Sequence, residues 1–217
     1  MSDSSDLKIL AEILDSARTM GAEYADAVLL RKERLAASVR LGEKEDITRA
    51  EGVDVGLRVF VGQSQAVIAT ADLSKESLHT CAERAVAMAK VAPSDPYAGL
   101  ADRSRLYQGG ADFDLFDARE MSADELAQVA MEAEDAARSV DGVTNSEGAG
   151  AERSVLHFAL ATSAGFAQER RSSSASISTS VIAGSGTAME RDYAYSTARH
   201  WSDLESAVTI GKRAGER

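Results

Sequence analysis

Hydrophobic residues recur at two different periods along the chain, and these periods predict its elements. Residues 7–17 place leucine and alanine at helical spacing, and Gly21 then ends the helix. Residues 53–61 place valine and leucine at every second position, which is the pattern of a strand with one buried face. Two further helices are expected, one after Ser74, a good N-cap residue, and one after the capping box Ser122-Ala-Asp-Glu125.

Short strands joined by turns account for most of the remaining apolar positions. The charged segment Lys32-Glu33-Arg34 and the pair Glu51-Gly52 are interpreted as turns. A second capping box, Ser202-Asp-Leu-Glu205, predicts a last helix. That helix has no stop signal before Arg217, so we expect the chain to continue beyond this residue. The predicted strands cover residues 25–31, 35–41, 43–49, 53–61, 64–70, 143–162, 166–182 and 187–197.

The order of these elements predicts the fold class. Helix, antiparallel strands, helix, long loop, helix, antiparallel strands and helix indicate an α+β protein, with helices packed on a mostly antiparallel sheet. Residues 92–120 hold both prolines of the chain, and long connections of this kind tend to be functional or to join subdomains. We therefore expect subregions at about 1–91 and 121–217, joined by the loop at 92–120.

Composition excludes several classes of function. With 44% hydrophobic residues, the 217-residue chain can bury a sizeable core. Its 24 basic and 35 acidic residues give a net charge of −11, which repels phosphate and argues against direct nucleic-acid binding. No signal peptide and no apolar run near the ~20 residues of a membrane span are recognised. The single cysteine, Cys81, fits a reducing compartment, so we expect a cytoplasmic protein.

The histidines and serines of this chain do not occur in the sequence motifs of common metal sites or catalytic sites. His79, His157 and His200 are far apart in the sequence, and none belongs to a pairing that would bring two imidazoles together on one helix. No Gly-x-Ser-x-Gly nucleophile motif occurs. We therefore expect no catalytic residue and no metal ligand in this chain.

The most unusual segment is a strand with a row of small hydroxyl groups on one face. Two interpretations are open. The row could be the solvated outer face of an ordinary strand, or it could be a wall or edge that accepts an extended peptide by strand addition. The residues of this candidate peptide-facing strand are Ser172, Ser174, Ser176, Ser178 and Ser180.

Four short segments, taken together and in order, resemble the TldD/PmbA family, whose older description is modulator of DNA gyrase. The resemblance covers most of residues 5–217. In the last segment Ala164 stands where the family's turn carries asparagine, so this chain lacks that side chain for bonding to the backbone. The four segments are Val53–Gly62, Ala69–Ser74, Ala92–Ala101 and Thr162–Phe166.

The resemblance carries expectations about fold and assembly. It implies the fold of the family's N-terminal part, with a β-rich C-terminal domain absent from this chain. It implies a heterodimer of a TldD-type and a PmbA/TldE-type subunit, which acts as a zinc metalloprotease on unfolded peptides in peptide maturation and antitoxin turnover. The TldD-type subunit carries an H-E-x-x-x-H helix that this sequence lacks. We therefore expect a PmbA/TldE-type subunit without a cofactor, with zinc in a TldD-type partner.

Two other functions fit the same residues. One is a regulatory binding protein that modulates DNA gyrase or a toxin–antitoxin system without proteolysis. The other is a homodimer, formed through a sheet edge when the chain is isolated.

Overall fold

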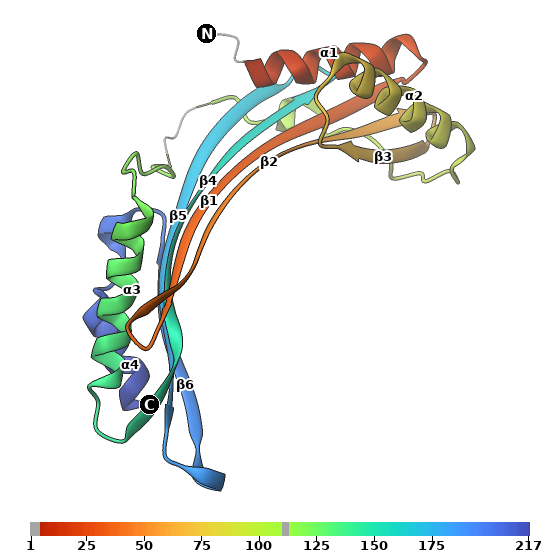
Figure 1. The fold of residues 1–217 in the computed structure, drawn as a ribbon. Helices are drawn as coiled ribbons and strands as arrows, with labels where there is room; N and C mark the ends of the chain where they lie inside the picture. The colour runs from red at the N-terminus through yellow and green to blue at the C-terminus, as the bar shows by residue number, and fades with distance from the viewer. Residues whose placement is uncertain (1–4, 110–112) are drawn as a thin grey trace. The chain divides into compact units, whose positions relative to one another are not determined.

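A computed structural model describes residues 5–109 and 113–217. The start of the chain and three residues of the expected 92–120 loop lie outside these ranges. The helices and strands are shown in Figure 1. They are α1 (Ser5–Thr19), β1 (Tyr24–Arg40), β2 (Glu43–Val61), β3 (Ser64–Thr70), α2 (Lys75–Val91), α3 (Ala123–Arg138), β4 (Val143–Thr162), β5 (Ala167–Ala183), β6 (Glu190–Ala198) and α4 (Ala207–Glu216), with short 3₁₀ turns at Arg103–Arg105, Gly186–Ala188 and Trp201–Asp203.

The six described strands form one antiparallel sheet in the order β3-β2-β1-β4-β5-β6. At one edge β3 pairs with β2 from Val61↔Ser64 to Val55↔Thr70. At the other edge β6 pairs with β5 from Ala183↔Glu190 to Ala175↔Ala198. The predicted α+β class with a mostly antiparallel sheet is confirmed.

Two of the predicted turns are wrong, because the strands of the first half are longer than the sequence suggested. Residues 32–34 lie inside β1, and residues 51–52 lie inside β2. The chain reverses at Leu41 and Gly42, between the predicted strands 35–41 and 43–49, and their φ angles of 55° and 81° are those of a tight hairpin turn. The charged side chains at 32–34 are exposed, so the strand continues there without the apolar alternation that would reveal it.

The described chain divides into two compact units that are not contiguous in sequence. Unit 1 comprises Met1–Arg31, Gly52–Phe113 and His157–Arg171. Unit 2 comprises Lys32–Glu51, Asp114–Leu156 and Ser172–Arg217. The strands β1, β2, β4 and β5 each contribute residues to both units, and the boundary between Phe113 and Asp114 falls within the loop at 92–120. The subregions at about 1–91 and 121–217 stay a prediction.

Unit 1 has its own hydrophobic core beneath α1 and α2, which lie side by side in Figure 1. Leucine and isoleucine side chains of α1 pack against a face of α2 that includes three alanines. Residues of β1, β2 and β4 complete this core. The N-cap predicted at Ser74 is confirmed, since its side chain accepts a hydrogen bond from the amide of Ser77. The fully buried residues at the centre include Leu10, Ile13, Leu29, Leu57, Ala82 and Ala85.

Unit 2 packs α3 and α4 side by side over its own core (Figure 1). A side chain at Gly211 would place its Cβ 2.2 Å from the carbonyl oxygen of Ala133, and one at Gly215 would meet Val140 at 2.6 Å. These two glycines of α4 weaken its helix propensity, but they allow the close approach to α3. The capping box Ser122–Glu125 at the start of α3 is confirmed.

The start of α4 differs from the expectation. Ser206, and not Ser202, caps the helix by accepting a hydrogen bond from the amide of Thr209. Ser202 lies in a 3₁₀ turn, and Glu205 forms an ion pair with Arg213 at 2.8 Å. The predicted capping box at 202–205 is therefore wrong, because the sequence offers two serines four residues apart and the second begins the helix.

Within the described ranges, no helix combines the length and the apolar composition that crossing a membrane would require.

Candidate functional site

The serine row of β5 has the two-sided arrangement that its sequence period predicted. Ser173, Ala175, Ile177, Thr179 and Val181 are buried. The alternate positions lie on the opposite face of the strand and are more exposed than their neighbours. The residues on this second face are Ser172, Ser174, Ser176, Ser178 and Ser180.

The strand β5 is not a free edge where these serines lie. Its residues 175–183 are paired with β6 on one side, and β4 is its neighbour on the other. Just before this stretch, the amide of Ser173 donates to the carbonyl oxygen of Leu115 at 2.9 Å. An extended peptide therefore cannot add to β5 as a strand over these residues. The interpretation of the row as a wall stays a prediction.

The serine row borders a groove on this face of unit 2. The groove has a volume of about 280 Å³, and Ser176 and Ser178 form part of its lining. Its other walls carry small residues of β1 and β4 and charged residues of both signs, of which Arg34 and Glu152 form an ion pair at 2.5 Å. The remaining lining residues are Ala36, Ala37, Ser38, Asp46, Thr48, Gly150 and Ala151.

Two exposed tyrosines of β6 extend this surface. In the register of the β5–β6 pair, Tyr195 lies opposite Ser178 and Tyr193 lies opposite Ser180. Cross-strand partners project to the same face of a sheet, so both rings flank the serine row. The rings are stacked with their centroids 6.3 Å apart, and they are 54% and 60% exposed. Small hydroxyls beside exposed aromatic rings form a surface suited to hydrogen bonds and apolar contacts with a chain laid over it.

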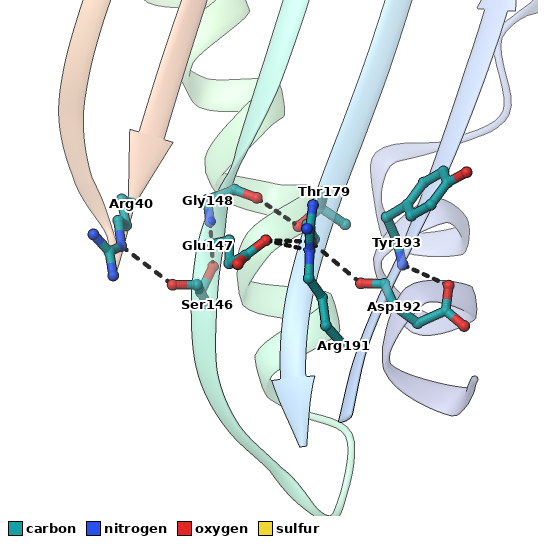
Figure 2. A network of polar contacts seen from close by, with 9 residues as sticks. Arg40, Ser146, Glu147, Gly148, Thr179, Arg191, Asp192 and Tyr193 are labelled. Carbon is teal, nitrogen blue, oxygen red and sulfur yellow. Dashed lines mark hydrogen bonds and ion pairs between the residues drawn. The ribbon is translucent and has the colours of Figure 1, made fainter. Parts of the chain in front are cut away.

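One end of the serine row is held by an ion pair. Figure 2 shows Glu147 of β4 facing Arg191 of β6, and their charged atoms are 2.5 Å apart. The hydroxyl of Ser180 donates to Glu147 at 3.0 Å and accepts from Arg191 at 3.3 Å. Ser180 is thus part of a fixed polar network, whereas Ser176 and Ser178 line the groove.

The outer edge of β6 is covered by side chains from α4 and from its C-cap residue, Arg217. Arg213 donates to the carbonyl oxygen of Tyr195 at 3.0 Å, and Arg217 donates to that of Tyr193 at 3.1 Å. Unpaired carbonyls of an edge strand would otherwise attract another strand. Strand addition to β6 would have to displace both guanidinium groups.

A partly buried set of hydrogen bonds fixes the start of the serine row. The hydroxyl of Ser173 donates to the carbonyl oxygen of Arg199 and accepts from the amide of Asp117, both at 2.8 Å. The carboxylate of Asp117 accepts from the amides of Trp201 and Arg119. These donors, that of Trp201 foremost, lower the pKa of Asp117, so this set of hydrogen bonds holds an ionised carboxylate at neutral pH.

Glu134 of α3 is the one charged side chain that is buried within residues 5–109 and 113–217, and it has no exposed surface. It was not among the residues predicted from the sequence. Its carboxylate accepts from the amides of Leu41 and Gly42, both at 2.8 Å, and from the hydroxyl of Ser146 at 2.5 Å. Burial alone would raise the pKa of Glu134, but these three donors together lower it. One signal was present in the sequence, since Glu134 lies four residues after Ala130 on the apolar stripe of α3.

The three histidines lie on separate parts of the fold. His79 lies on α2, His157 on β4 and His200 just before the turn at Trp201–Asp203. In residues 5–109 and 113–217, no group of three or more histidine, cysteine, aspartate or glutamate side chains is arranged to hold a metal ion. Cys81 is buried, and its burial raises the pKa of the thiol. We assign no chemical step to these residues.

Two family models match the chain and define its class. Residues 25–89 match the PmbA/TldA metallopeptidase domain 1, and residues 116–217 match the PmbA/TldA metallopeptidase central domain. The matches follow one another in the order of these two domains. The chain therefore contains domain 1 and the central domain of a PmbA/TldA-type metallopeptidase.

Named relatives agree with this class. Metalloprotease PmbA of Escherichia coli O157:H7 is 30% identical over 97% of this chain and 48% of its own length. The Metalloprotease PmbA homolog of Haemophilus influenzae is 30% identical over 92% of this chain and 44% of its own length. The chain belongs to the PmbA/TldD family. It spans about half the length of the curated relatives that it matches.

Solved structures share the fold. TldE from Thermococcus kodakarensis superposes with a TM-score of 0.79 at 16% identity, covering 96% of this chain and 46% of that one. A candidate modulator of DNA gyrase from Bacteroides thetaiotaomicron superposes with a TM-score of 0.91 at 23% identity, covering 99% of this chain and 50% of that one. At these identities the likeness establishes the fold alone.

Proposed function

We propose that this chain is the PmbA/TldE-type, non-catalytic subunit of a two-subunit metalloprotease that degrades unfolded peptides in the cytoplasm. The observation that supports this proposal most is the match to Metalloprotease PmbA over 97% of the chain. The sequence also lacks the H-E-x-x-x-H motif expected of a TldD-type subunit. Zinc would then be held by a TldD-type partner, and this chain would position the peptide.

The groove beside the serine row is the surface that fits this role. Because Ser176 and Ser178 are small, the backbone of an extended peptide could lie close to the sheet. The hydroxyls offer donors and acceptors whatever the peptide's sequence. Tyr193 and Tyr195 offer apolar contacts at the side of the row. A surface of this kind would hold unfolded chains with little selectivity, as degradation requires.

The subunit assignment is tested by reconstitution. The chain is purified alone, and again together with a TldD-type subunit of the same organism. Light scattering should detect a complex of the two subunits, and zinc analysis should find metal only when the partner is present. Cleavage of an unfolded peptide should need the partner. Stoichiometric zinc and peptide cleavage with the chain alone would overturn the proposal.

The peptide-facing role of the serine row needs a separate test. Ser178→Lys places a long side chain in the groove, so we expect the reconstituted complex to bind an unfolded peptide about tenfold more weakly. Ser185→Lys is the matched control, because Ser185 is exposed in the turn after β5 and its side chain caps nothing. Equal affinity of the two variants would show that the row is an ordinary outer face.

A second candidate function rests on the names of two structural relatives, from Bacteroides thetaiotaomicron and Thermotoga maritima, each described as a candidate modulator of DNA gyrase. In this function the chain would bind gyrase or a toxin–antitoxin protein without proteolysis. Affinity capture with the tagged chain separates the two functions. Recovery of gyrase without a TldD-type protein favours the regulatory function, and recovery of a TldD-type protein favours the protease subunit.

A further inference from the structure

Unit 1 contains an aromatic pocket that has no role in the proposed function as stated above. It has a volume of about 280 Å³, and its walls are mostly apolar. Phe158 and Leu160 of β4 alternate with Ala159 and Ala161, which are buried in the core beneath α1 and α2. The pocket therefore lies on the face of unit 1 opposite these helices. Its other walls are Tyr107, Phe113, Phe166 and Arg170, with Gln168 beside them.

Four of the eleven aromatic residues of the chain line this pocket. Three of its five phenylalanines line it, whereas Phe60 is the one phenylalanine that the fold buries. Phe113 remains 60% exposed and Phe158 36% exposed. Exposing large apolar rings to water is unfavourable, and a clustered set of them commonly marks a binding site.

Arg170 gives the pocket a polar end. Its guanidinium carbon lies 5.0 Å from the ring centroid of Tyr107 and 6.0 Å from that of Phe113. A guanidinium stacked on rings keeps its N–H groups in its own plane, where they can meet a carboxylate with two parallel hydrogen bonds. In the part of the chain that the structure describes, no carboxylate forms an ion pair with Arg170.

From these features we infer that the pocket is a subsite for the carboxyl-terminal residue of a peptide. The apolar side chain of that residue enters the aromatic walls, and its α-carboxylate meets Arg170. A C-terminal phenylalanine or leucine carries both groups on one Cα, which suits a cavity near the lower end of the roughly 300–1,000 Å³ of ligand pockets. An internal residue offers the side chain without the carboxylate. This inference rests on the proposed peptide function and adds a preference for chain ends.

The preference is measured with labelled peptides that differ only at their last residue. One ends in phenylalanine with a free carboxylate, the second is its amide, and the third ends in alanine with a free carboxylate. Fluorescence anisotropy is recorded with the chain alone and with its reconstituted complex. We expect the first peptide to bind about tenfold more tightly than either of the others, as one charge-assisted contact or one buried ring would give.

Two substitutions assign the preference to the pocket. Arg170→Gln should remove the difference between acid and amide, and Phe158→Ala should remove the difference between phenylalanine and alanine. Arg171→Gln, one residue along the same strand, makes the same change of charge and should leave both differences intact. Thermal unfolding of each variant checks that it is folded. Loss of a preference in the Arg171 variant alone would overturn the assignment.

Four results would overturn the inference. If all three peptides bind equally, the pocket does not recognise chain ends, although the proposed peptide function stands. If no peptide binds in either preparation, the proposed function fails with it. If 3-phenylpropionate, which has the ring and the carboxylate but no peptide group, binds as tightly as the first peptide, the ligand is a small amphipathic acid. If Phe158→Ala instead dissociates a homodimer seen by light scattering, the pocket is an interface between copies of the chain.

Discussion

Glu134 lies in an environment that is unusual for a carboxylate, because its side chain is fully buried. A carboxylate without exposed surface is costly unless donors replace its water shell. Here the donors are two amides of the β1–β2 turn and the hydroxyl of Ser146, so one side chain of α3 ties the helix to a hairpin and to β4. The positive φ angles of Leu41 and Gly42 direct both turn amides to the same carboxylate.

Replacement of the Glu134 carboxylate should lower the stability of the folded protein without changing its exposed surface. Glu134→Gln keeps the size of the side chain but removes its charge and puts an N–H₂ group toward a backbone amide. We expect the free energy of unfolding to fall by about 2 kcal/mol. Urea denaturation measures it, with the exposed Glu132→Gln on the same helix as the control. An equal small effect of both substitutions would contradict the role given to Glu134.

The lowered pKa of Glu134 also predicts a pH dependence. The pKa of an unfolded glutamate is about 4.3, and the pKa of the folded group is lower. The stabilisation is therefore complete above about pH 4.3 and is lost as the pH falls through the folded pKa. Urea titrations at several pH values should show a constant difference between wild type and Glu134→Gln at neutral pH. Below about pH 4 this difference should shrink. A difference that is independent of pH would refute the assignment.

At the scale of elements, α4 shows why glycine, a weak helix former, can stabilise a helix where it packs closely against another helix. Gly211 and Gly215 lie one turn apart and face α3, where a Cβ would meet backbone or side-chain atoms closer than 3 Å. The cost in helix propensity of about 1 kcal/mol for each glycine is the smaller effect, because a side chain there would force the two helices apart.

Gly211→Ala should therefore destabilise the protein although alanine favours helices. We expect a net loss of about 1–3 kcal/mol in the free energy of unfolding, the range found for overpacked cores. The matched control is Gly52→Ala, because no atom lies within 4 Å of a Cβ built at Gly52 and its φ angle is not positive. If Gly211→Ala stabilises the protein in urea denaturation, then α3 and α4 do not pack as closely as described.

The covered edge of β6 leads to a prediction about self-association. In the double variant Arg213→Ala, Arg217→Ala, the carbonyls of Tyr193 and Tyr195 lose their guanidinium partners. We expect this edge to pair with other chains, which light scattering would detect as a rise in mean mass with protein concentration. The control is Lys212→Ala, on the exposed side of the same helix. A monodisperse double variant would show that these arginines do not protect the edge.

At the scale of the whole molecule, the net charge of −11 limits the partners that the chain can bind. Its charge repels phosphate, so any effect on a DNA-dependent enzyme would act through a protein contact. In a gel-shift assay with duplex DNA we therefore expect no retarded band, even at low salt where electrostatic attraction is strongest. A band that weakens as salt is added would contradict this expectation.

Several features of the fold were predictable because they depend only on residues that are near one another in the sequence. The strand at 53–61, the first helix and the caps at Ser74 and Ser122 follow from periodicity and from side chains that bond to nearby amides. The long strands β1 and β2 were not recognised, because exposed charges interrupt the alternation that marks a strand. Their continuity depends on contacts with neighbouring strands, such as the ion pair between Arg34 of β1 and Glu152 of β4.

The sequence by itself determined the α+β class, the two-sided serine strand and the resemblance to the PmbA/TldD family, because each of these depends on residues that are close in the chain. Only the tertiary structure decided that β5 is an interior strand, that Glu134 joins α3 to the β1–β2 turn, and that Tyr107 shares a pocket with Phe158. These relations join residues far apart in the sequence, and no local pattern specifies which of the many possible partners a residue will meet.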